Sequence, residues 1–209
     1  EVLAHCRVMV AATSLPVSTD LENGYADKLD DVAETYRLAG EAGLVGASIE
    51  DATGNPDRPI YDLSEAVERF SAALEAVRSL PFHFTLTARA ENFLHGRPDL
   101  HDTIERLQAF EKAGADVLFA PGLPDLEAVR TVCQSLSKPV NVVRGLTGAQ
   151  MSVAELSAAG VRRISVGASF ARAAFGAFIR AAHEVKDEGT FDYAAEAASF
   201  KDIGNLLKG

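Results

Sequence analysis

The chain has 209 residues, and its 20 lysine and arginine residues against 30 aspartate and glutamate residues give a formal net charge of −10. Hydrophobic residues make up 47% of the chain, which is ordinary for a globular protein and excludes a disordered one. The acidic balance argues against nucleic-acid binding and against docking on anionic membranes, because both need basic surfaces.

The sequence gives no sign of a membrane or secreted protein. No apolar run reaches the roughly 18 residues of a membrane span, and the first residues lack the basic and apolar regions of a signal peptide. Cys6 and Cys133 have no metal-ligand spacing, so we expect buried free thiols and a cytoplasmic location.

Short apolar segments alternate along the chain with longer segments of helical period. The first residues, up to Val10, resemble the end of a helix that leads into the first strand. The predicted strands are 16–21, 45–50, 82–89, 116–120, 139–143 and 162–166. Between the second and third strands, apolar residues recur at helical spacing: Leu63, Ala66, Val67, Phe70, Ala73, Leu74 and Val77.

Helix ends are marked by capping signals. A capping residue followed three positions later by glutamate predicts helix starts at Asp62 and Ser152. An Ala-Gly pair predicts three helix ends directly before a strand, because glycine adopts the left-handed turn that closes a helix: Gly43, Gly114 and Gly160.

This βα repeat predicts parallel strands with helices packed outside them. No Gly-x-Gly-x-x-Gly follows any strand, which argues against a dinucleotide-binding sheet. A TIM (β/α)8 barrel needs eight strands, typically in about 250 residues. We therefore expect a single α/β barrel domain over residues 1–209, with about six βα units present and the first two absent.

Charged residues gather where three neighbouring strands end. Asp20 and Glu22 end the first strand at period-two spacing, Glu50 ends the second, and Arg89 ends the third. Carboxylates gathered this closely need a cation or a proton, and oxygen ligands favour Mg²⁺ or Mn²⁺. The alternative is that these acids cap helices or form surface ion pairs.

Arg89 follows an apolar strand and needs a negatively charged partner there. Glu91, a barrel carboxylate or an anionic substrate could pair with it. Other chemistries are poorly supported, because no lysine lies at the inner end of a strand and no Gly-x-Ser-x-Gly is present. Residues 145–148 and 167–169 form possible phosphate-binding turns, although plain βα turns are the favoured interpretation.

Three of these strand ends resemble the isocitrate lyase/phosphoenolpyruvate mutase superfamily. Residues 16–25, PVSTDLENGY, resemble its metal-binding strand. Residues 46–51, GASIED, resemble its next acidic strand, and residues 87–92, TARAEN, resemble its substrate-arginine strand. Residues 116–122 and 163–167 also resemble segments of this superfamily, so the resemblance covers almost the whole chain, with the motifs in the same order.

The resemblance implies a (β/α)8 barrel that exchanges its last helix between subunits, giving homodimers or homotetramers. It implies that Asp20 binds Mg²⁺, with Glu22 and Glu50 acting directly or through water. Arg89 would bind the substrate carboxylate and act in catalysis, and Glu91 and Asn92 would also bind the substrate. The implied activity is that of a Mg²⁺-dependent lyase, mutase or decarboxylase, which makes or breaks a C–C or P–C bond of a small 2-oxo acid through a metal-bound enolate.

Residues 52–61, ATGNPDRPIY, depart from the superfamily lyases. They lack the cysteine of the lyase lid, so a true isocitrate lyase is not expected. Asn55 corresponds loosely to the asparagine of the mutase lid, and we expect it to be catalytic. We expect a mobile flap here. The alternatives are a barrel that binds a carboxylate without turnover and a phosphate-binding isomerase barrel.

The last residues, 190–209, are expected to form a helical tail that packs on a neighbouring subunit, because one helical face is apolar. The residues on this face are Phe191, Tyr193, Ala194, Ala197, Ala198, Phe200, Ile203, Leu206 and Leu207.

Overall fold

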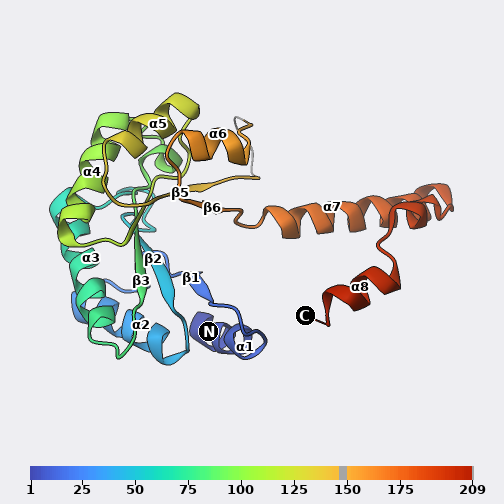
Figure 1. Cartoon of the computed structure of the whole chain (residues 1–209), viewed down its shortest axis with the longest axis horizontal. Helices are drawn as coiled ribbons and strands as arrows, with labels where there is room; N and C mark the ends of the chain where they lie inside the picture. The colour runs from blue at the N-terminus through green and yellow to red at the C-terminus, as the bar shows by residue number, and fades with distance from the viewer. Residues whose placement is uncertain (146–149, 209) are drawn as a thin grey trace. The chain divides into compact units, whose positions relative to one another are not determined.

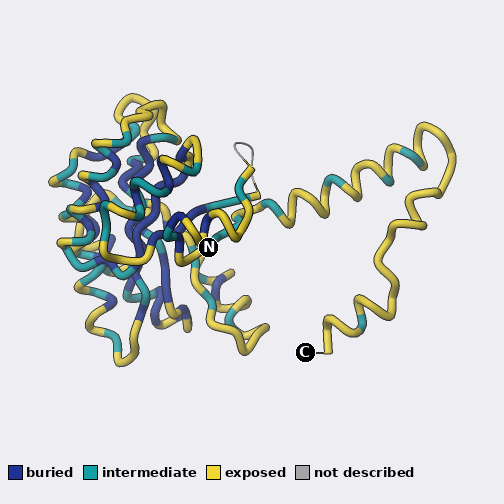
Figure 2. Tube along the Cα trace, turned by 45° about the horizontal axis from the view of Figure 1, so that its top comes forward, coloured by how far each residue is buried: buried dark blue, intermediate teal, exposed yellow. Residues whose placement is uncertain are grey.

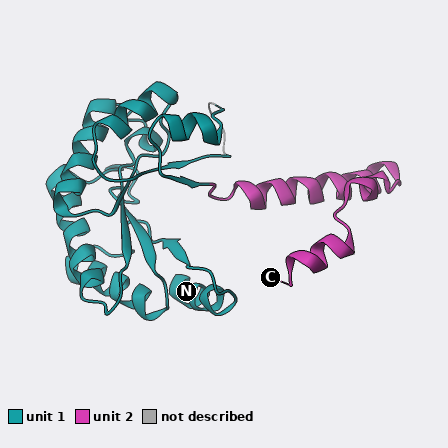
Figure 3. Ribbon diagram, in the orientation of Figure 1, with its two compact units in different colours: residues 1–165 teal, residues 166–209 magenta. Residues whose placement is uncertain are grey.

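The computed structural model describes residues 1–145 and 150–208 (Figure 1). The chain divides into two compact units, Glu1–Ser165 and Val166–Gly209 (Figure 3). The expectation of a single domain with a tail at 190–209 stays a prediction. Residues 146–148 of the possible phosphate-binding turn lie outside the described residues.

Six short strands and six α-helices build the described part of unit 1. The strands are β1 (Ser18–Asp20), β2 (Gly46–Glu50), β3 (Thr85–Arg89), β4 (Val117–Phe119), β5 (Val140–Val143) and β6 (Arg163–Ser165). The helices are α1 (Val2–Ala11), α2 (Leu29–Glu41), α3 (Leu63–Arg78), α4 (Leu100–Ala113), α5 (Leu126–Gln134) and α6 (Val153–Ala158), with a 3₁₀ turn η1 (Asn92–His95) after β3. All six strands lie inside their predicted ranges.

The strands form one parallel sheet in the order β1-β2-β3-β4-β5-β6, with helices on its convex side (Figure 1). This half-barrel confirms the predicted α/β class with parallel strands, and the two absent βα units stay a prediction. The register places Asp20 opposite Ser48, Glu50 opposite Arg89, and Arg89 opposite Phe119. Residues in register on neighbouring strands point to the same face, so these five side chains share one face of the sheet.

The two faces of the sheet differ in chemistry. The face toward the helices is apolar and buried, with side chains that alternate with those of the polar face: Ala47, Ile49, Leu86, Ala88, Leu118 and Val142. Burying this face against the helices drives folding. The opposite face carries the charged strand ends.

Most predicted helix boundaries are confirmed, but one cap is not formed. Ser152 and Glu155 make the reciprocal capping bonds at the start of α6, with Ser152 Oγ 3.2 Å from the Glu155 amide nitrogen. The Asp62 carboxylate makes no capping bond; it pairs instead with Arg58, at 3.1 Å. The predicted glycines close their helices with positive φ, as at Gly114 with φ 109°.

Unit 2 contains α7 (Ser169–His183), a π-helical turn η2 (Glu184–Glu188), a 3₁₀ turn η3 (Asp192–Glu196) and α8 (Phe200–Leu206). None of its described residues is buried, in contrast with the sheet of unit 1 (Figure 2). In residues 1–145 and 150–208, no helix is both long and apolar enough to cross a membrane.

Candidate active site

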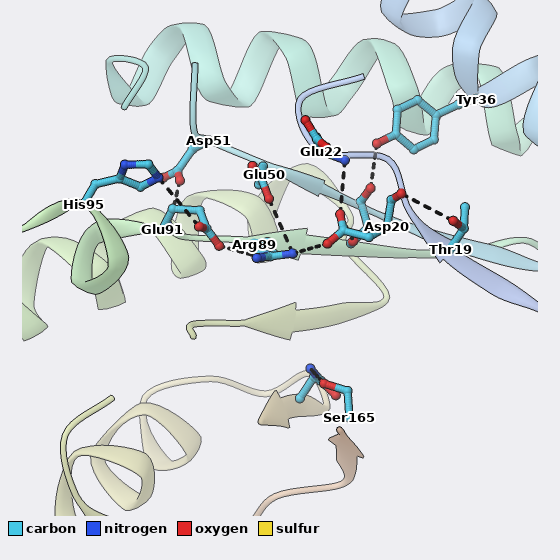
Figure 4. Close-up of polar contacts among 12 residues, drawn as sticks. Thr19, Asp20, Glu22, Tyr36, Glu50, Asp51, Arg89, Glu91, His95 and Ser165 are labelled. Carbon is cyan, nitrogen blue, oxygen red and sulfur yellow. Dashed lines mark hydrogen bonds and ion pairs between the residues drawn. The ribbon is translucent and has the colours of Figure 1, made fainter. Parts of the chain in front are cut away.

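Arg89 lies at the centre of a charged cluster at the carboxyl ends of β1, β2 and β3 (Figure 4). Its Nη1 contacts Asp20 Oδ2 and lies 3.4 Å from Glu50 Oε2, while its Nε lies 2.5 Å from Glu91 Oε1. We call these four residues the arginine cluster. Parallel strands bring their carboxyl ends to one edge, which is why residues 20, 50 and 89 meet.

Neighbouring side chains orient both ends of the cluster. Ser48 Oγ donates to Asp20 Oδ1 at 3.0 Å, from the position directly opposite on β2. The Arg89 guanidinium lies 5.1 Å from the centre of the Phe119 ring, also directly opposite, where the π face attracts a cation.

The cluster concentrates negative charge in a partly buried place, and this environment shifts the pKa values of its side chains. Burial, with the nearby Glu91 charge, raises the pKa of Glu50 to about 8, although Arg89 opposes this shift. Burial also raises the pKa of Glu91. Burial alone would lower the pKa of Arg89, but Glu91, Asp20 and Glu50 together raise it. The site therefore contains more carboxylate than one guanidinium neutralises, which favours an additional cation or proton.

Residues 21–27, which we call the acidic loop, turn the chain sharply after Asp20. Glu22 and Tyr25 have φ values of 50° and 55°, in the left-handed region that costs non-glycine residues on the order of 1–3 kcal/mol each. The Glu22 amide donates to Asp20 Oδ1 at 3.1 Å. Its carboxylate points away from Asp20 and Arg89 (Figure 4), so this structure does not bring Glu22 into the arginine cluster.

Residues 52–61, the lid, form a short closed loop after β2. An antiparallel bridge joins Ala52 to Ile60, and the Thr53 amide donates to the Pro59 carbonyl at 2.9 Å. Asn55 lies exposed at the tip, where its Oδ1 accepts from the Asp57 amide at 2.9 Å. The bonds described for Asn55 stay inside the lid, and its catalytic role stays a prediction.

Asn92 is fully buried at the start of η1, and its Nδ2 donates to Asp102 on α4. Its Oδ1 is buried without a hydrogen-bond partner in the described part of the chain. The expected contact between Asn92 and a substrate is therefore not visible in this arrangement, and it stays a prediction.

A second, buried network of hydrogen bonds contacts the arginine cluster at Glu91. Asp51 is 1% exposed; its Oδ1 accepts from the Glu91 amide at 2.8 Å and its Oδ2 lies 3.2 Å from Arg106 Nη1. Arg106 also donates to the Tyr61 carbonyl at 3.0 Å. This network joins the ends of β2 and β3 to the base of the lid.

Sequence reasoning did not single out Ser48, Asp51, Phe119 or Arg106. Ser48 and Phe119 could have been found by aligning the predicted strand ends, because each stands opposite a predicted site residue. The pairing of Asp51 with Arg106 spans 55 positions and leaves no local sequence signal.

Oxygen donors at Asp20 and Glu50 are the kind that Mg²⁺ and Mn²⁺ prefer. Among the described residues, no group of three or more histidine, cysteine, aspartate or glutamate side chains is arranged to hold a metal ion. The reason is geometric: Arg89 Nη1 lies between Asp20 and Glu50, and Glu22 points elsewhere. Two carboxylates facing one position still suit Mg²⁺, which often uses one or two and keeps several waters.

Comparison with known proteins identifies the family. The family model for phosphoenolpyruvate phosphomutase matches residues 1–186. The crystal structure of a suggested lyase/mutase from Burkholderia cenocepacia J2315 is 55% identical with a TM-score of 0.95, and the match covers 99% of this chain and 74% of that one.

Two curated enzymes are more distant relatives. The 2-methylisocitrate lyase of Escherichia coli K12 is 30% identical over 146 residues, which are 67% of this chain and 48% of that protein. The oxaloacetate decarboxylase of Bradyrhizobium diazoefficiens is 32% identical over 145 residues, which are 67% of this chain and 49% of that protein. The chain thus spans about half the length of these relatives. It belongs to the phosphoenolpyruvate phosphomutase family, as its strand-end motifs predict.

Proposed function

We propose that this chain is part of a Mg²⁺- or Mn²⁺-dependent enzyme that makes or breaks a C–C or P–C bond next to the carbonyl of a small 2-oxo acid. The observation that carries this proposal is the arginine cluster, in which one guanidinium and several carboxylates meet at the carboxyl ends of adjacent parallel strands. In barrel enzymes this edge is where catalytic residues lie. Family membership supports the reaction class, because the curated relatives include a lyase and a decarboxylase.

The half-barrel of unit 1 supports a complete (β/α)8 barrel in the working protein, with two further βα units next to the six seen here. A curved parallel sheet that stays open has two unpaired edges, and closure into a barrel removes both. In the six-stranded sheet these edges are β1 and β6. The two added units would also contribute residues to the site.

The donor set at the strand ends fits a divalent cation. Asp20 and Glu50 would hold it, with Glu22 acting directly or through water. Burial and the nearby Glu91 charge raise the pKa of Glu50, and an added cation would favour its ionised form. When bound, the cation supplies the positive charge that stabilises an oxyanion beside a carboxylate.

Arg89 has the groups needed to bind the substrate carboxylate. Glu91 holds its Nε, and Nη1 faces Asp20 and Glu50. Among the described residues, its Nη2 takes part in none of these ion pairs. The N–H groups of Nη2 can therefore donate a charge-assisted hydrogen bond to the substrate carboxylate. Arg89 would in this way orient the 2-oxo acid relative to the carboxylates of β1 and β2.

The lid excludes the acid–base chemistry that a lid cysteine performs, because residues 52–61 contain no cysteine and no histidine. A true isocitrate lyase is therefore not proposed. Asn55 can donate a hydrogen bond to the substrate without titrating, and closing the lid over the strand ends would exclude water from the reacting carbon.

The experiment is a turnover screen of the purified protein with Mg²⁺ against oxaloacetate, 2-methylisocitrate, phosphonopyruvate and 2-methylmalate. We expect turnover of at least one substrate, its loss in EDTA, and its recovery with Mg²⁺ or Mn²⁺. Calorimetric binding of one of these acids without turnover would instead favour the carboxylate-binding alternative. Turnover that persists in EDTA would contradict the metal role of Asp20 and Glu50.

The exposed apolar side chains of unit 2 support assembly with a second copy of this chain. Phe170, Phe175 and Phe178 on α7 and Phe200 on α8 are 65–97% exposed. Aromatic surface on this scale usually marks an interface. We therefore propose a homodimer or homotetramer in which unit 2 packs on a neighbouring subunit, and light scattering tests it.

A further inference from the structure

Arg69 on α3 is a buried cation that the proposed chemistry does not use. It is 3% exposed, and it has no carboxylate partner among the residues that the structure describes. A buried charge without a counter-ion is costly unless polar groups surround it. The groups around the Arg69 guanidinium therefore show how its charge is compensated.

Three backbone carbonyls of the acidic loop accept hydrogen bonds from Arg69. Its Nη2 donates to the carbonyl of Asn23 at 2.8 Å and to that of Ala26, and its Nη1 donates to that of Asp27 at 3.0 Å. The guanidinium lies 4.5 Å from the centre of the Tyr61 ring. One side chain thus holds the acidic loop and contacts the base of the lid.

The acidic loop and the lid are also bonded to each other at this point. Asn23 Nδ2 lies 3.3 Å from the carbonyl oxygen of Thr53 and 3.2 Å from Oη of Tyr61. Asn23 stands between Glu22 and Gly24 in the loop, and Tyr61 closes the lid. Arg69 therefore lies at the joint between the segment that carries the acidic residues and the segment that would cover the substrate.

The acidic loop needs such a holder, because it contains two non-glycine residues in the left-handed region, Glu22 and Tyr25. Residues in this conformation persist only where their surroundings enforce it. Converging carbonyl groups of a loop repel one another unless a donor stands between them. A planar guanidinium with several fixed N–H groups satisfies three such carbonyls at once, which a lysine ammonium does not match.

We infer that Arg69 is a positioning residue: it holds the acidic loop in its left-handed conformation, from which the Glu22 amide bonds the Asp20 carboxylate, and it couples this loop to the lid through Tyr61. The part of this inference that concerns a cation rests on the proposed function. The part that concerns the loop and the lid does not.

Arg78 provides a matched control on the same helix. Its Nη1 donates to the Phe84 carbonyl at 3.0 Å and its Nη2 contacts Asp116 Oδ1 at 2.6 Å. These partners directly precede β3 and β4, so Arg78 binds at the amino ends of the strands, opposite to the site. Arg78→Lys should lower the melting temperature without affecting the acidic loop.

The first measurement is amide hydrogen exchange in the metal-free protein. Amides of the acidic loop and the lid are hydrogen bonded within these segments, as in Gly24 to Leu21 at 2.8 Å and Thr53 to Pro59 at 2.9 Å. In Arg69→Lys we expect faster exchange in residues 22–27 and 53–61 together, with β4 and β5 unchanged. Arg78→Lys should leave both segments at the wild-type rate.

The second measurement is the affinity for Mn²⁺ alone, followed by electron paramagnetic resonance. We expect Arg69→Lys to weaken it by roughly 10–100-fold, the usual effect of losing a group that orients metal ligands. If the wild-type protein binds no Mn²⁺, the proposed function fails, and the exchange measurement still decides the role of Arg69.

Two substitutions of Tyr61 test the joint if Arg69→Lys does not fold. Tyr61→Phe keeps the ring against Arg69 but loses the hydroxyl that contacts Asn23, whereas Tyr61→Leu loses both. We expect loop exchange to increase in the order wild type, Phe, Leu. Wild-type exchange and Mn²⁺ affinity in every folded variant would overturn the inference, even if the melting temperature falls, because Arg69 would then be structural only.

Discussion

Helices α3 and α7 have similar lengths and similar amphipathic patterns, but their apolar side chains differ in how far they are buried. α3 has 16 residues and lies in unit 1, where Phe70 is 1% exposed. α7 has 15 residues and lies in unit 2, where Phe178 is 69% exposed. Burying one such side chain contributes roughly 1.5–3 kcal/mol, so α7 leaves a large stabilisation unrealised.

This contrast suggests that unit 1 carries the chemistry of the chain and that unit 2 carries its assembly. Unit 1 buries its apolar face within itself, and its charged groups gather at the strand ends (Figures 2 and 4). None of the described residues of unit 2 is buried (Figure 2), and its aromatic side chains on α7 and α8 are exposed. Substitutions in unit 1 should therefore change chemistry without changing assembly, and substitutions in unit 2 should do the reverse.

The largest expected effect is that of Asp20→Asn, which removes one of the two carboxylates nearest Arg89 Nη1. We expect Mg²⁺-dependent turnover to fall at least about 1,000-fold, equivalent to roughly 4 kcal/mol of lost transition-state stabilisation. The circular dichroism spectrum and the oligomer mass should stay unchanged. Asp30→Asn, on the exposed first turn of α2, is the control. Wild-type turnover by Asp20→Asn would remove this residue from the site.

Asn55→Ala should lower kcat by about 100-fold, as expected for one lost hydrogen-bond donor to the transition state. Mg²⁺ affinity should stay nearly unchanged. Asn55→Asp separates the two properties of this side chain, because it keeps the acceptor for the Asp57 amide and loses the donor. Equal activity of the two variants and the wild type would contradict the role of the lid.

Phe178→Ser in α7 should weaken subunit association by roughly 10–100-fold, since it removes one exposed aromatic side chain worth about 2 kcal/mol of burial. Analytical ultracentrifugation over a concentration series measures this change. Lys186→Gln, in η2, is the control substitution. A wild-type protein that is monomeric at micromolar concentration would contradict assembly through unit 2.

Glu50 predicts a dependence of stability and cation affinity on pH. Its pKa is raised from 4.5 to about 8, so the folded chain binds its proton more tightly than the unfolded chain does. Between these values the folded state holds more protons, and this carboxyl's contribution to the free energy of unfolding decreases as pH rises. Mg²⁺ affinity should increase over the same interval, because the cation needs the carboxylate.

Calorimetry at pH 5 to 8.5 on the wild type and Glu50→Gln isolates this effect. We expect Glu50→Gln to gain stability relative to the wild type as pH rises, by a few degrees in melting temperature at most, since the side chain is partly exposed. Parallel curves for the two proteins would show that Glu50 does not titrate in this range.

The smallest expected effect is that of thiol alkylation. Cys6 is buried and Cys133 is half-buried, with a pKa raised by burial. Iodoacetamide should therefore leave turnover unchanged in the native protein, and the rate should show no titration near the ordinary thiol pKa of about 8.5. Inactivation at the rate of Cys133 or Cys6 modification would contradict a cysteine-free mechanism.

Local patterns in the sequence were sufficient to predict the helices and strands and part of the candidate site. The six strands, the capping box at Ser152 and the meeting of Asp20, Glu50 and Arg89 could all be predicted, because residue periodicity and the common edge of parallel strands depend on few distant contacts. Asp62 illustrates the limit. Its capping pattern resembles that of Ser152, but Arg58 from the lid competes for its carboxylate.

The tertiary structure decided what no local pattern contains. The orientation of Glu22 depends on a left-handed backbone, the support of Glu91 comes from Asp51, and the acidic loop is held by Arg69 from 42 to 46 positions away. Such contacts join segments brought together only after the helices pack on the sheet. Periodicity determines which residues are buried, whereas the direction of a polar side chain depends on which partner lies within hydrogen-bond distance once the chain has folded.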